Sequence, residues 1–557
     1  MAMRTGGQIL VASLAAQQAT HAFGVPGESY LPVLDALYDA AGAPTFVVCR
    51  HEAGAAYMAE AYGKLTGRPG ILFVTRGPGA SNAAIGIHTA RQDSTPLIAF
   101  VGQVGTDMVD REAFQEIDYR RMYGSVAKWA AQVDRADRIP EYVAHAFRVA
   151  MSGRPGPVVI ALPEDVLAAS ADVGDAPRVE AIAAPASRED VLRVEALLRD
   201  AKRPLVIVGG SRWDDDARAA LMRFAEASRL PVACAFRHQD LFDNRNAVYA
   251  GDVGIGINPK LAARVRDADL LLVIGERLGE MTTSGYTLLD VPVPKQILVH
   301  VHPGAEELGR VYQPAVAICA TPGAFLEAID ASAARSPLRD GATSAHADYE
   351  AWRAPRAVPG DVDLWQIVRW LDERLPADAV LTNGAGNYTT WIHRLFRYGG
   401  RRRQLAPYSG SMGYGVPSAV AAKLVHPDRV VVSWNGDGCF LMNGQELATA
   451  IQYGVAVVFV VIDNGMYGTI RMHQERAYPG RVSGTDLVNP DFAALARAYG
   501  AHGETIVNTS EFAPAFERAL ACGRAALLHV KIDPQAITMN ATLDELRDQA
   551  LKARRFQ

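Results

Sequence analysis

Residues 434–450, WNGDGCFLMNGQELATA, and residues 457–468, VVFVVIDNGMYG, indicate how this chain folds. The apolar run RVVVSW predicts a strand that ends at Asn435, the sequence Gly-Asp-Gly at 436–438 predicts a turn, and NGQELATA predicts a helix. A second apolar strand ends at residues 463–465. This order predicts two parallel, neighbouring strands whose carboxyl ends lie at the same edge of a sheet.

The same order recurs along the whole chain. The apolar runs are TFVVCR, GILFVTRGPG, PLIAFVGQ and GPVVIALP, then PLVIVGG, PVACAF, DLLLVIGE and ILVHVHP, then VLTNGAG, RVVVSWNGDG, VAVVFVVIDNG and LLHVKI. They are continuous rather than alternating, as a sheet covered by helices on both faces requires. The sequence therefore predicts an α/β protein with three doubly wound parallel-sheet domains, whose ligands bind beyond the carboxyl ends of strands.

Two segments interrupt this pattern. Residues 167–189 and 331–362 are rich in Ala, Pro and Asp and have no apolar periodicity, which is typical of linkers. They divide the chain into predicted domains at residues 1–166, 190–330 and 363–540.

Composition excludes several classes of protein. The chain has 557 residues, 49% hydrophobic and 21% charged, and its net charge of −5 argues against a nucleic-acid partner. No apolar run is long enough to span a membrane. The run ILVASLAA, behind Arg4, lacks a clear cleavage site and predicts a first amphipathic helix rather than a signal peptide. The five dispersed cysteines predict neither disulfides nor zinc and favour the cytoplasm.

Asp437 and Asn464 lie 27 positions apart, at the ends of the two strands quoted first. One carboxylate, one amide oxygen and a nearby backbone carbonyl form an incomplete oxygen site, which Mg²⁺ tolerates because phosphate oxygens and water complete its octahedron. A lone Gly-Asp-Gly is usually only a turn, but the spacing and the second Asn-Gly turn favour a magnesium-bound diphosphate.

At these residues the chain resembles the thiamine-diphosphate-dependent enzymes, and more closely their acetolactate synthase branch. The motifs that carry the resemblance are FGVPGESY (23–30), RHEAGAAYMAEAYGK (50–64), TRGPGASNAAIGIHTARQDSTP (75–96), VGQV (101–104), AFQE (113–116) and SGSMGYGVPSAVAAK (409–423). The resemblance implies an N-terminal pyrimidine-binding domain, a Rossmann-like middle domain and a C-terminal diphosphate-binding domain. It also implies active sites between the first domain of one subunit and the third of another, hence a homodimer or homotetramer.

The resemblance assigns roles to individual residues. Glu52 opens a predicted helix, where the helix dipole alone would favour an acid, and corresponds to the glutamate that hydrogen-bonds the cofactor pyrimidine and promotes its activation. Asp437, Asn464 and the backbone carbonyl of Met466 would bind the metal. The remaining expected cofactor contacts are Gly27, Ala385, Gly386, Asn387, Tyr388, Gly410, Met412, Gly438, Cys439, Tyr467 and Gly468.

A third set is expected to shape the substrate pocket. The resemblance gives Glu28 and Gln103 catalytic positions, while Phe114 and Gln115 would line the pocket. Arg277 would hold the carboxylate of a second 2-oxoacid, and His473 stands where biosynthetic relatives have a tryptophan. Glu28 can equally be a surface turn residue and Arg277 a solvated loop residue.

The resemblance implies a carboligase acting on 2-oxoacids, which decarboxylates pyruvate and condenses it with a second carbonyl. The alternatives are a 2-oxoacid decarboxylase, a benzaldehyde lyase-type acyloin lyase or ligase, and a cofactor-binding protein without activity. Glu28, where acetolactate synthases have a small residue, and the sequence LGEM after Arg277 favour the decarboxylase or lyase. FAD is a further candidate because of GDVGIG at 251–256, but it is the less favoured one, since no GxGxxG follows PLVIVGG.

Overall fold

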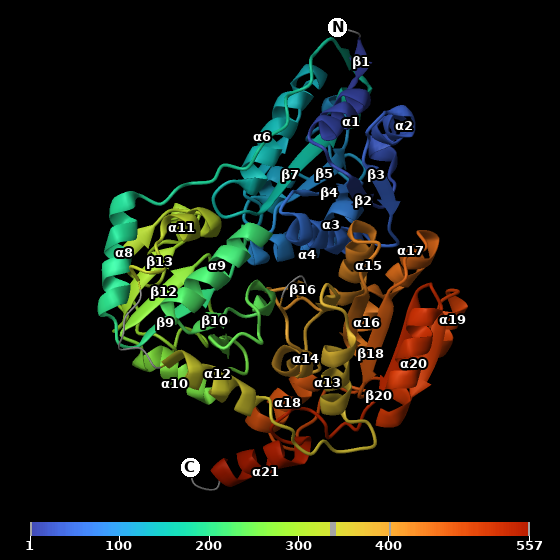
Figure 1. Ribbon diagram of the computed structural model, residues 1–557. Helices are drawn as coiled ribbons and strands as arrows, with labels where there is room; N and C mark the ends of the chain where they lie inside the picture. Colours follow the sequence, from blue (N-terminus) through green and yellow to red (C-terminus); the bar gives the residue numbers. More distant parts are fainter. Residues whose placement is uncertain (1–2, 335–340, 400–402, 555–557) are drawn as a thin grey trace. The chain divides into compact units, whose positions relative to one another are not determined.

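Three parallel sheets of six strands form the framework of the computed structural model, which describes residues 3–334, 341–399 and 403–554 (Figure 1). The chain divides into two compact units. The first extends to Ile182 and includes residues 420–425, and the second contains residues 183–419 and 426–557. The predicted α/β class with three sheets is confirmed.

The first sheet has the strand order β3-β2-β4-β5-β7-β6. Its strands are β2 (His21–Gly24), β3 (Thr45–Val48), β4 (Gly70–Val74), β5 (Leu97–Gln103), β6 (Trp129–Gln132) and β7 (Pro157–Pro163). The helices of this unit are α1 (Gly6–Ala16), α2 (Leu31–Asp39), α3 (Glu52–Thr66), α4 (Gly77–Asp93), α5 (Tyr119–Tyr123), α6 (Ile139–Met151) and α7 (Glu164–Ala168). Every residue of β4, β5 and β7 is buried, which explains their continuous apolar sequences.

The third sheet repeats this topology, with the order β16-β15-β17-β18-β20-β19. Numbered along the chain within each sheet, both orders are 2-1-3-4-6-5. The strands are β15 (Val380–Asn383), β16 (Arg403–Leu405), β17 (Val431–Gly436), β18 (Val458–Asp463), β19 (His502–Ile506) and β20 (Ala526–Lys531). The helices are α13 (Leu364–Arg374), α14 (Thr389–Leu395), α15 (Gly415–Val425), α16 (Asp437–Asn443), α17 (Leu447–Gln452), α18 (Gly468–Ala477), α19 (Phe492–Ala498), α20 (Thr509–Ala521) and α21 (Leu543–Arg554).

The middle sheet has the order β11-β10-β9-β12-β13-β14, which is 3-2-1-4-5-6, the Rossmann order. Its strands are β9 (Pro204–Val208), β10 (Val232–Cys234), β11 (Tyr249–Asp252), β12 (Leu270–Ile274), β13 (Ile297–Val301) and β14 (Val316–Ile318). The helices are α8 (Arg188–Asp200), α9 (Asp215–Ser228), α10 (Pro259–Asp267), α11 (Pro322–Ala328) and α12 (Gly341–Trp352).

Four details differ from the sequence-based expectations. The predicted turn at 436–438 is the start of a helix, since α16 begins at Asp437 directly after β17. The predicted linker 331–362 contains α12, whose Tyr349 is buried in the middle-domain core, while its residues 335–340 lie outside the described residues. The linker 167–189 contains β8 (Ser170–Ala171), which pairs with β1 (Arg4–Thr5). Helix α1 is buried on most sides rather than amphipathic.

Among the described residues, no helix combines the length and the apolar character that crossing a membrane requires.

Candidate active site

A cavity of about 230 Å³ lies at the carboxyl edge of the third sheet, where the chain leaves β15, β17 and β18. Strands β15 and β17 are the first and third of that sheet and lie side by side, so the connections from them run in opposite directions. This topological switch point is where doubly wound sheets bind ligands. The cavity is lined by Ala385, Gly386, Asn387, Tyr388, Trp391, Gly410, Met412, Gly436, Asp437, Gly438, Cys439, Ile462, Asn464, Met466, Tyr467, Gly468, Thr469, Ile470, Ile532, Ala536 and Ile537.

The cavity brings together every cofactor and metal candidate that the sequence places in the C-terminal domain. They come from four segments, 385–388, 410–412, 437–439 and 464–468, which are separated by more than twenty residues along the chain. The sequence analysis missed the apolar part of the lining, chiefly Trp391, Ile470 and three residues of the segment 532–537. That segment follows β20 and carries no motif, so its position at the cavity could not be inferred from the sequence.

Asp437 is a buried carboxylate that hydrogen bonds hold in place. Its Oδ1 accepts the amide of Gly438 (2.8 Å), and its Oδ2 accepts the amide of Gly465 (3.0 Å) and Nδ2 of Asn489 (2.8 Å). Burial raises the pKa of Asp437 to about 6, although the donated hydrogen bonds oppose this rise. The carboxylate of Asp463 lies alongside and adds to the rise in the pKa of Asp437.

Asp463, the last residue of β18, is held from three sides. Its Oδ1 accepts the amide of Gly465 (3.0 Å) and Nδ2 of Asn489 (2.7 Å), and its Oδ2 accepts Nε2 of His529 (2.8 Å). Burial would raise the pKa of Asp463, but the hydrogen bonds donated by His529 and Asn489 outweigh burial and lower it to about 2. Neither Asp463, Asn489 nor His529 lines the cavity.

The oxygen atoms at this edge of the sheet that could coordinate a metal fit a magnesium ion that carries a phosphate ligand. Asp437 offers a carboxylate, Asn464 an amide oxygen and Met466 a backbone carbonyl, all hard oxygen ligands. Two neighbouring carboxylates also favour a cation. Within the described residues, no group of three or more His, Cys, Asp or Glu could hold a metal alone. An ion at Asp437 therefore needs oxygens from its own ligand.

The loops around the cavity depend on glycine at two positions. Gly386 has φ +142°, a conformation that L residues rarely adopt. A Cβ added at Gly438 would lie 2.7 Å from the ring of Tyr467. Gly438 also begins the α16 turn together with Asp437, so its amide lies at a helix N-terminus that lines the cavity. This is the backbone geometry that phosphate groups occupy.

Cys439 and Asn387 join the cavity loops to each other. The Cys439 thiol donates to the carbonyl of Ala385 (2.9 Å), and burial raises the pKa of this thiol, which keeps it neutral. Nδ2 of Asn387 donates to the carbonyl of Ile537 (3.0 Å), while its Oδ1 accepts the hydroxyl of Thr469 (3.0 Å). The Asn387 side chain thus binds the protein rather than the cavity.

The candidates of the first unit lie at the carboxyl edge of its own sheet. Glu52 is the first residue of α3 and is half-buried, and its Oε2 accepts Nδ2 of Asn82 (3.0 Å). Asn82 lies in a motif that carries the resemblance, but the sequence analysis did not single it out. A Cβ at Gly27 would lie 2.5 Å from Cβ of Thr75, so this turn accepts only glycine. Glu28 is exposed at the start of a short 3₁₀ helix.

Gln103 and Gln115 help to fix a loop of the first unit. Gln103 is buried at the end of β5, where its Nε2 donates to the carbonyl of Ile117 (2.8 Å) and its Oε1 accepts the amide of Val104 (3.0 Å). The carbonyl of Gln115 accepts the amide of Gly77 (3.0 Å). Phe114 is 76% exposed in this chain.

Arg277 lies against the loop that carries Gly410 and Met412. Its guanidinium stacks over the ring of Tyr408, with Cζ 5.4 Å from the ring centroid. His473 is exposed on α18 and does not line the cavity. The structure therefore does not bring together all the residues of the second unit that the sequence analysis linked to the substrate.

The middle sheet does not fit a dinucleotide pyrophosphate at its own switch point. The N-terminus of α9, which follows β9, carries Asp214 as its cap and Asp215 and Asp216 in its first turn. Three carboxylates oppose a phosphate there. A Cβ at Gly209 would lie 2.4 Å from Oε2 of Glu276, so close packing rather than nucleotide binding accounts for this glycine.

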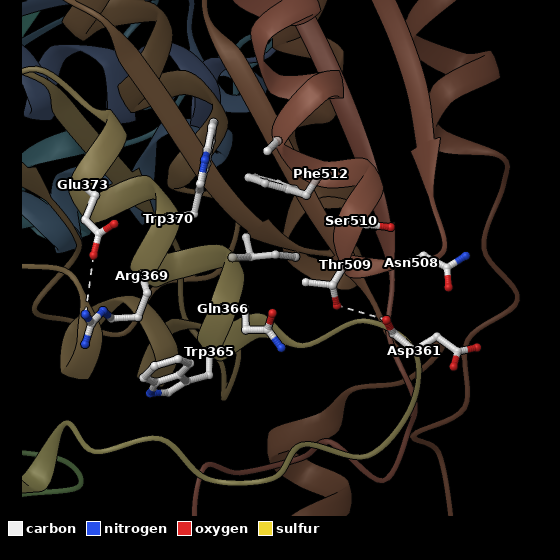
Figure 2. A pocket seen from close by; sticks show the side chains of 12 residues that line it. Asp361, Trp365, Gln366, Arg369, Trp370, Glu373, Asn508, Thr509, Ser510 and Phe512 are labelled. Atoms are coloured by element: carbon white, nitrogen blue, oxygen red, sulfur yellow. Dashed lines mark hydrogen bonds and ion pairs between the residues drawn. The ribbon is translucent and has the colours of Figure 1, made fainter.

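A larger cavity of about 680 Å³ contains none of the predicted residues. It lies between α13 and the start of α20, and Figure 2 shows the side chains of Trp365 and Trp370 along it. The amide of Asn508, just before α20, is accepted by the Glu511 carboxylate, and Arg369 pairs with Glu373 (3.5 Å).

Comparison with known proteins identifies three family domains. Residues 4–122 match the N-terminal TPP binding domain of thiamine pyrophosphate enzymes, residues 191–329 their central domain and residues 384–530 their C-terminal TPP binding domain. Thiamine pyrophosphate (TPP) is another name for thiamine diphosphate.

Similar proteins cover almost the whole chain. Acetolactate synthase isozyme 2 large subunit of Escherichia coli (strain K12) is 32% identical over 535 residues, 95% of this chain and 95% of its own. Acetolactate synthase of Arthrospira platensis is 31% identical over 95% of this chain and 94% of its own. Acetolactate synthase large subunit of Corynebacterium glutamicum is 32% identical over 92% and 84%. The chain therefore belongs to the thiamine pyrophosphate enzyme family.

Proposed function

We propose that this protein is a thiamine-diphosphate- and Mg²⁺-dependent carboligase of the acetolactate synthase type. In its simplest reaction, two pyruvates and one proton give one acetolactate and one CO₂. The observation that carries the proposal is the cavity at the switch point of the third sheet, with its three oxygen donors and glycine-rich loops. The near full-length similarity to proteins named acetolactate synthase supports it.

Different residues at the cavity would bind different parts of the cofactor. Asp437, Asn464 and the Met466 carbonyl would hold Mg²⁺, while Gly438 and Cys439 at the start of α16 would lie against the diphosphate. Met412, Gly410 and the loop 385–388 would enclose the rest. When bound, thiamine diphosphate supplies the nucleophile and the electron sink that decarboxylation of a 2-oxoacid needs.

Glu52 would act on the pyrimidine end of the cofactor. Asn82 donates to its Oε2, which orients the carboxyl group and leaves Oε1 for a proton shared with the pyrimidine. The resemblance implies that each active site combines the first domain of one subunit with the third domain of another, and we infer a homodimer or homotetramer on that ground. Gly27 would contact the cofactor at the same edge.

Arg277 would bind the carboxylate of the acceptor. A guanidinium recognises a carboxylate through two parallel hydrogen bonds, and stacking on Tyr408 fixes its plane. Glu28, Gln103, Phe114 and Gln115 would face the substrate from the other subunit. His473 would be the position that distinguishes acceptors, as the resemblance implies.

Two further inferences concern the cellular compartment of the enzyme and the cofactor FAD. The five cysteines, all within the described residues, form no disulfide, which fits a reducing compartment, and we infer a cytoplasmic enzyme. FAD stays the less favoured cofactor candidate, because the acidic N-terminus of α9 does not suit its pyrophosphate.

The test is product analysis on the purified protein with Mg²⁺, thiamine diphosphate and pyruvate. We expect two pyruvates to disappear for each acetolactate, which acid converts to acetoin. The variant Glu52→Gln should lose turnover of pyruvate while keeping its thermal stability, because Gln keeps the shape of the side chain but cannot share a proton. Free acetaldehyde without acetolactate would refute carboligation and favour a decarboxylase or aldehyde lyase.

A further inference from the structure

The two carboxylate oxygens of Asp437 differ in their hydrogen-bond partners. Oδ2 accepts two hydrogen bonds, from the Gly465 amide and from Nδ2 of Asn489, whereas Oδ1 accepts only the amide of its neighbour Gly438 among the described residues. A carboxylate oxygen has room for about two strong partners. Oδ2 is therefore occupied by the protein, and Oδ1 keeps capacity for another ligand.

Asn489 comes from the loop before α19 and does not line the cavity. Its Nδ2 bridges the two carboxylates, at 2.8 Å from Oδ2 of Asp437 and 2.7 Å from Oδ1 of Asp463. A single NH₂ group that uses both hydrogens in this way keeps two negative groups side by side and fixes the rotation of each. The amide of Gly465 makes the same bridge from the backbone, at 3.0 Å to each carboxylate.

Asp463 is itself anchored from behind. His529 on β20 is 1% exposed, and its Nε2 donates to Oδ2 of Asp463 (2.8 Å). The ring of Phe492 packs edge-on against the imidazole, with the centroids 5.0 Å apart. The chain of contacts thus runs from the core of the third sheet to the edge of the cavity.

We propose that Asn489 is a positioning residue for the metal site: by tying Oδ2 of Asp437 to Asp463, it leaves Oδ1 as the oxygen that meets a divalent cation. This inference rests on the proposed function, because it takes Asp437 as a magnesium ligand. Hydrogen-bonding partners of metal ligands set the orientation of those ligands, and their loss typically weakens metal binding by about 10–100-fold.

The experiment measures Mg²⁺ affinity directly. The wild-type protein and Asn489→Ala are titrated with Mg²⁺ at saturating thiamine diphosphate, and binding is followed by isothermal titration calorimetry. We expect the dissociation constant for Mg²⁺ to rise about 10-fold or more in Asn489→Ala. We also expect saturating Mg²⁺ to restore most of kcat, because the variant retains Asp437.

The matched control is Asn508→Ala. Asn508 caps α20 in the same domain, so its loss destabilises the fold by about 1 kcal/mol without touching the two carboxylates. Asn508→Ala should keep the Mg²⁺ affinity of the wild type. If Asn489→Ala behaves like this control, with lower stability but unchanged Mg²⁺ affinity, Asn489 is merely structural and the proposal is wrong.

A double-mutant cycle tests whether Asn489 acts through Asp463. Asp463→Ala should weaken Mg²⁺ binding, and the double variant should be no weaker than the weaker single variant, because both changes break one chain of contacts. Additive losses would refute the link. Should Asn489→Ala not fold, Asn489→Leu provides the same measurement, because Leu keeps the approximate size of the side chain and lacks the NH₂ group that bridges the two carboxylates.

The outcomes separate this inference from the proposed function. Wild-type protein that binds Mg²⁺ and thiamine diphosphate but makes no acetolactate refutes the carboligase, while the positioning role stands or falls on the affinities. Wild-type protein whose binding of thiamine diphosphate needs no Mg²⁺ refutes both.

Discussion

Asp372 on α13 is a fully buried carboxylate that joins the middle and C-terminal domains within the second unit. Its Oδ1 accepts the Arg397 amide (3.0 Å) and Nη2 of Arg245 (2.9 Å), and its Oδ2 accepts Nε of Arg397 (2.7 Å). Nη2 of Arg353 lies 3.7 Å from the same Oδ2. Arg245 belongs to the middle domain and Arg397 to the C-terminal domain, so one carboxylate neutralises cations from both.

We expect Asp372→Asn to lower the free energy of unfolding by about 3 kcal/mol. Breaking a buried ion pair costs roughly 3–5 kcal/mol because the remaining charge stays buried. The lower end applies because water reaches Arg245 and Arg397, whereas Arg353 is only 2% exposed. Arg353 then keeps the Leu395 carbonyl (2.6 Å) and the Glu350 carboxylate (3.0 Å) as partners.

Thermal unfolding measures this cost. One kcal/mol shifts Tm by roughly 2–4 °C in a unit of 150–250 residues and by less in a larger one, so Asp372→Asn should lower Tm by about 5 °C. The shift should change little between low and high salt, since a buried pair is poorly screened.

Glu373→Gln is the matched control: the neighbouring carboxylate is 64% exposed and pairs with Arg369 on the same helix. Such a pair contributes about 0.5 kcal/mol or less. Equal shifts for the two variants would refute the reasoning.

Two further predictions concern the core and the cofactor loop. Burial lowers the pKa of His300 to about 4, below its ordinary 6.5, so the unfolded chain binds a proton that the folded chain refuses between these values. At pH 5 this costs the fold about 2 kcal/mol, and His300→Gln should flatten the fall of Tm between pH 7 and pH 5; an equally steep fall in the variant would contradict the assignment. Gly386→Ala should weaken thiamine diphosphate binding about tenfold or more by calorimetry, because φ is +142° and the new Cβ would lie 2.9 Å from the Tyr388 ring. Gly480→Ala, also at positive φ but in open space, should bind normally.

The sequence predicts the central strands except β2, and of the edge strands it predicts only β3. In β4, β5 and β7 every residue is buried between two helical layers, so each strand is a continuous apolar run. The edge strands β16, RQL, and β19, HGETI, pair with a neighbour on one side only and are partly exposed. Their polar residues give no strand pattern, and hence the sequence analysis did not find them.

Some residues of the candidate site could likewise be predicted from the sequence, and others could not. Asp437 and Asn464 could be linked from the sequence because both follow apolar strands, and parallel neighbouring strands bring their carboxyl ends together. Asn489 and His529 could not, because they reach the site through tertiary hydrogen bonds from a loop and from the middle of β20. Their positions at the site depend on the tertiary fold, which no spacing along the chain predicts.

The repeated topology gives the two ends of the proposed site a common origin in the fold. Gly27 follows β2, the first strand of the first sheet, as Gly386 follows β15, the first strand of the third sheet. Both are therefore glycines at the carboxyl edge of a 2-1-3-4-6-5 sheet, where the switch point leaves room for a ligand. The chemistry differs because the side chains differ: one edge presents the carboxyl group of Glu52, and the other presents Asp437 with an amide-rich helix start. An anionic diphosphate with its cation suits the second edge only, since Glu52 offers no compensating positive charge. A heterocycle that shares a proton suits the first. Each edge therefore suits a different end of thiamine diphosphate, as the proposed function requires.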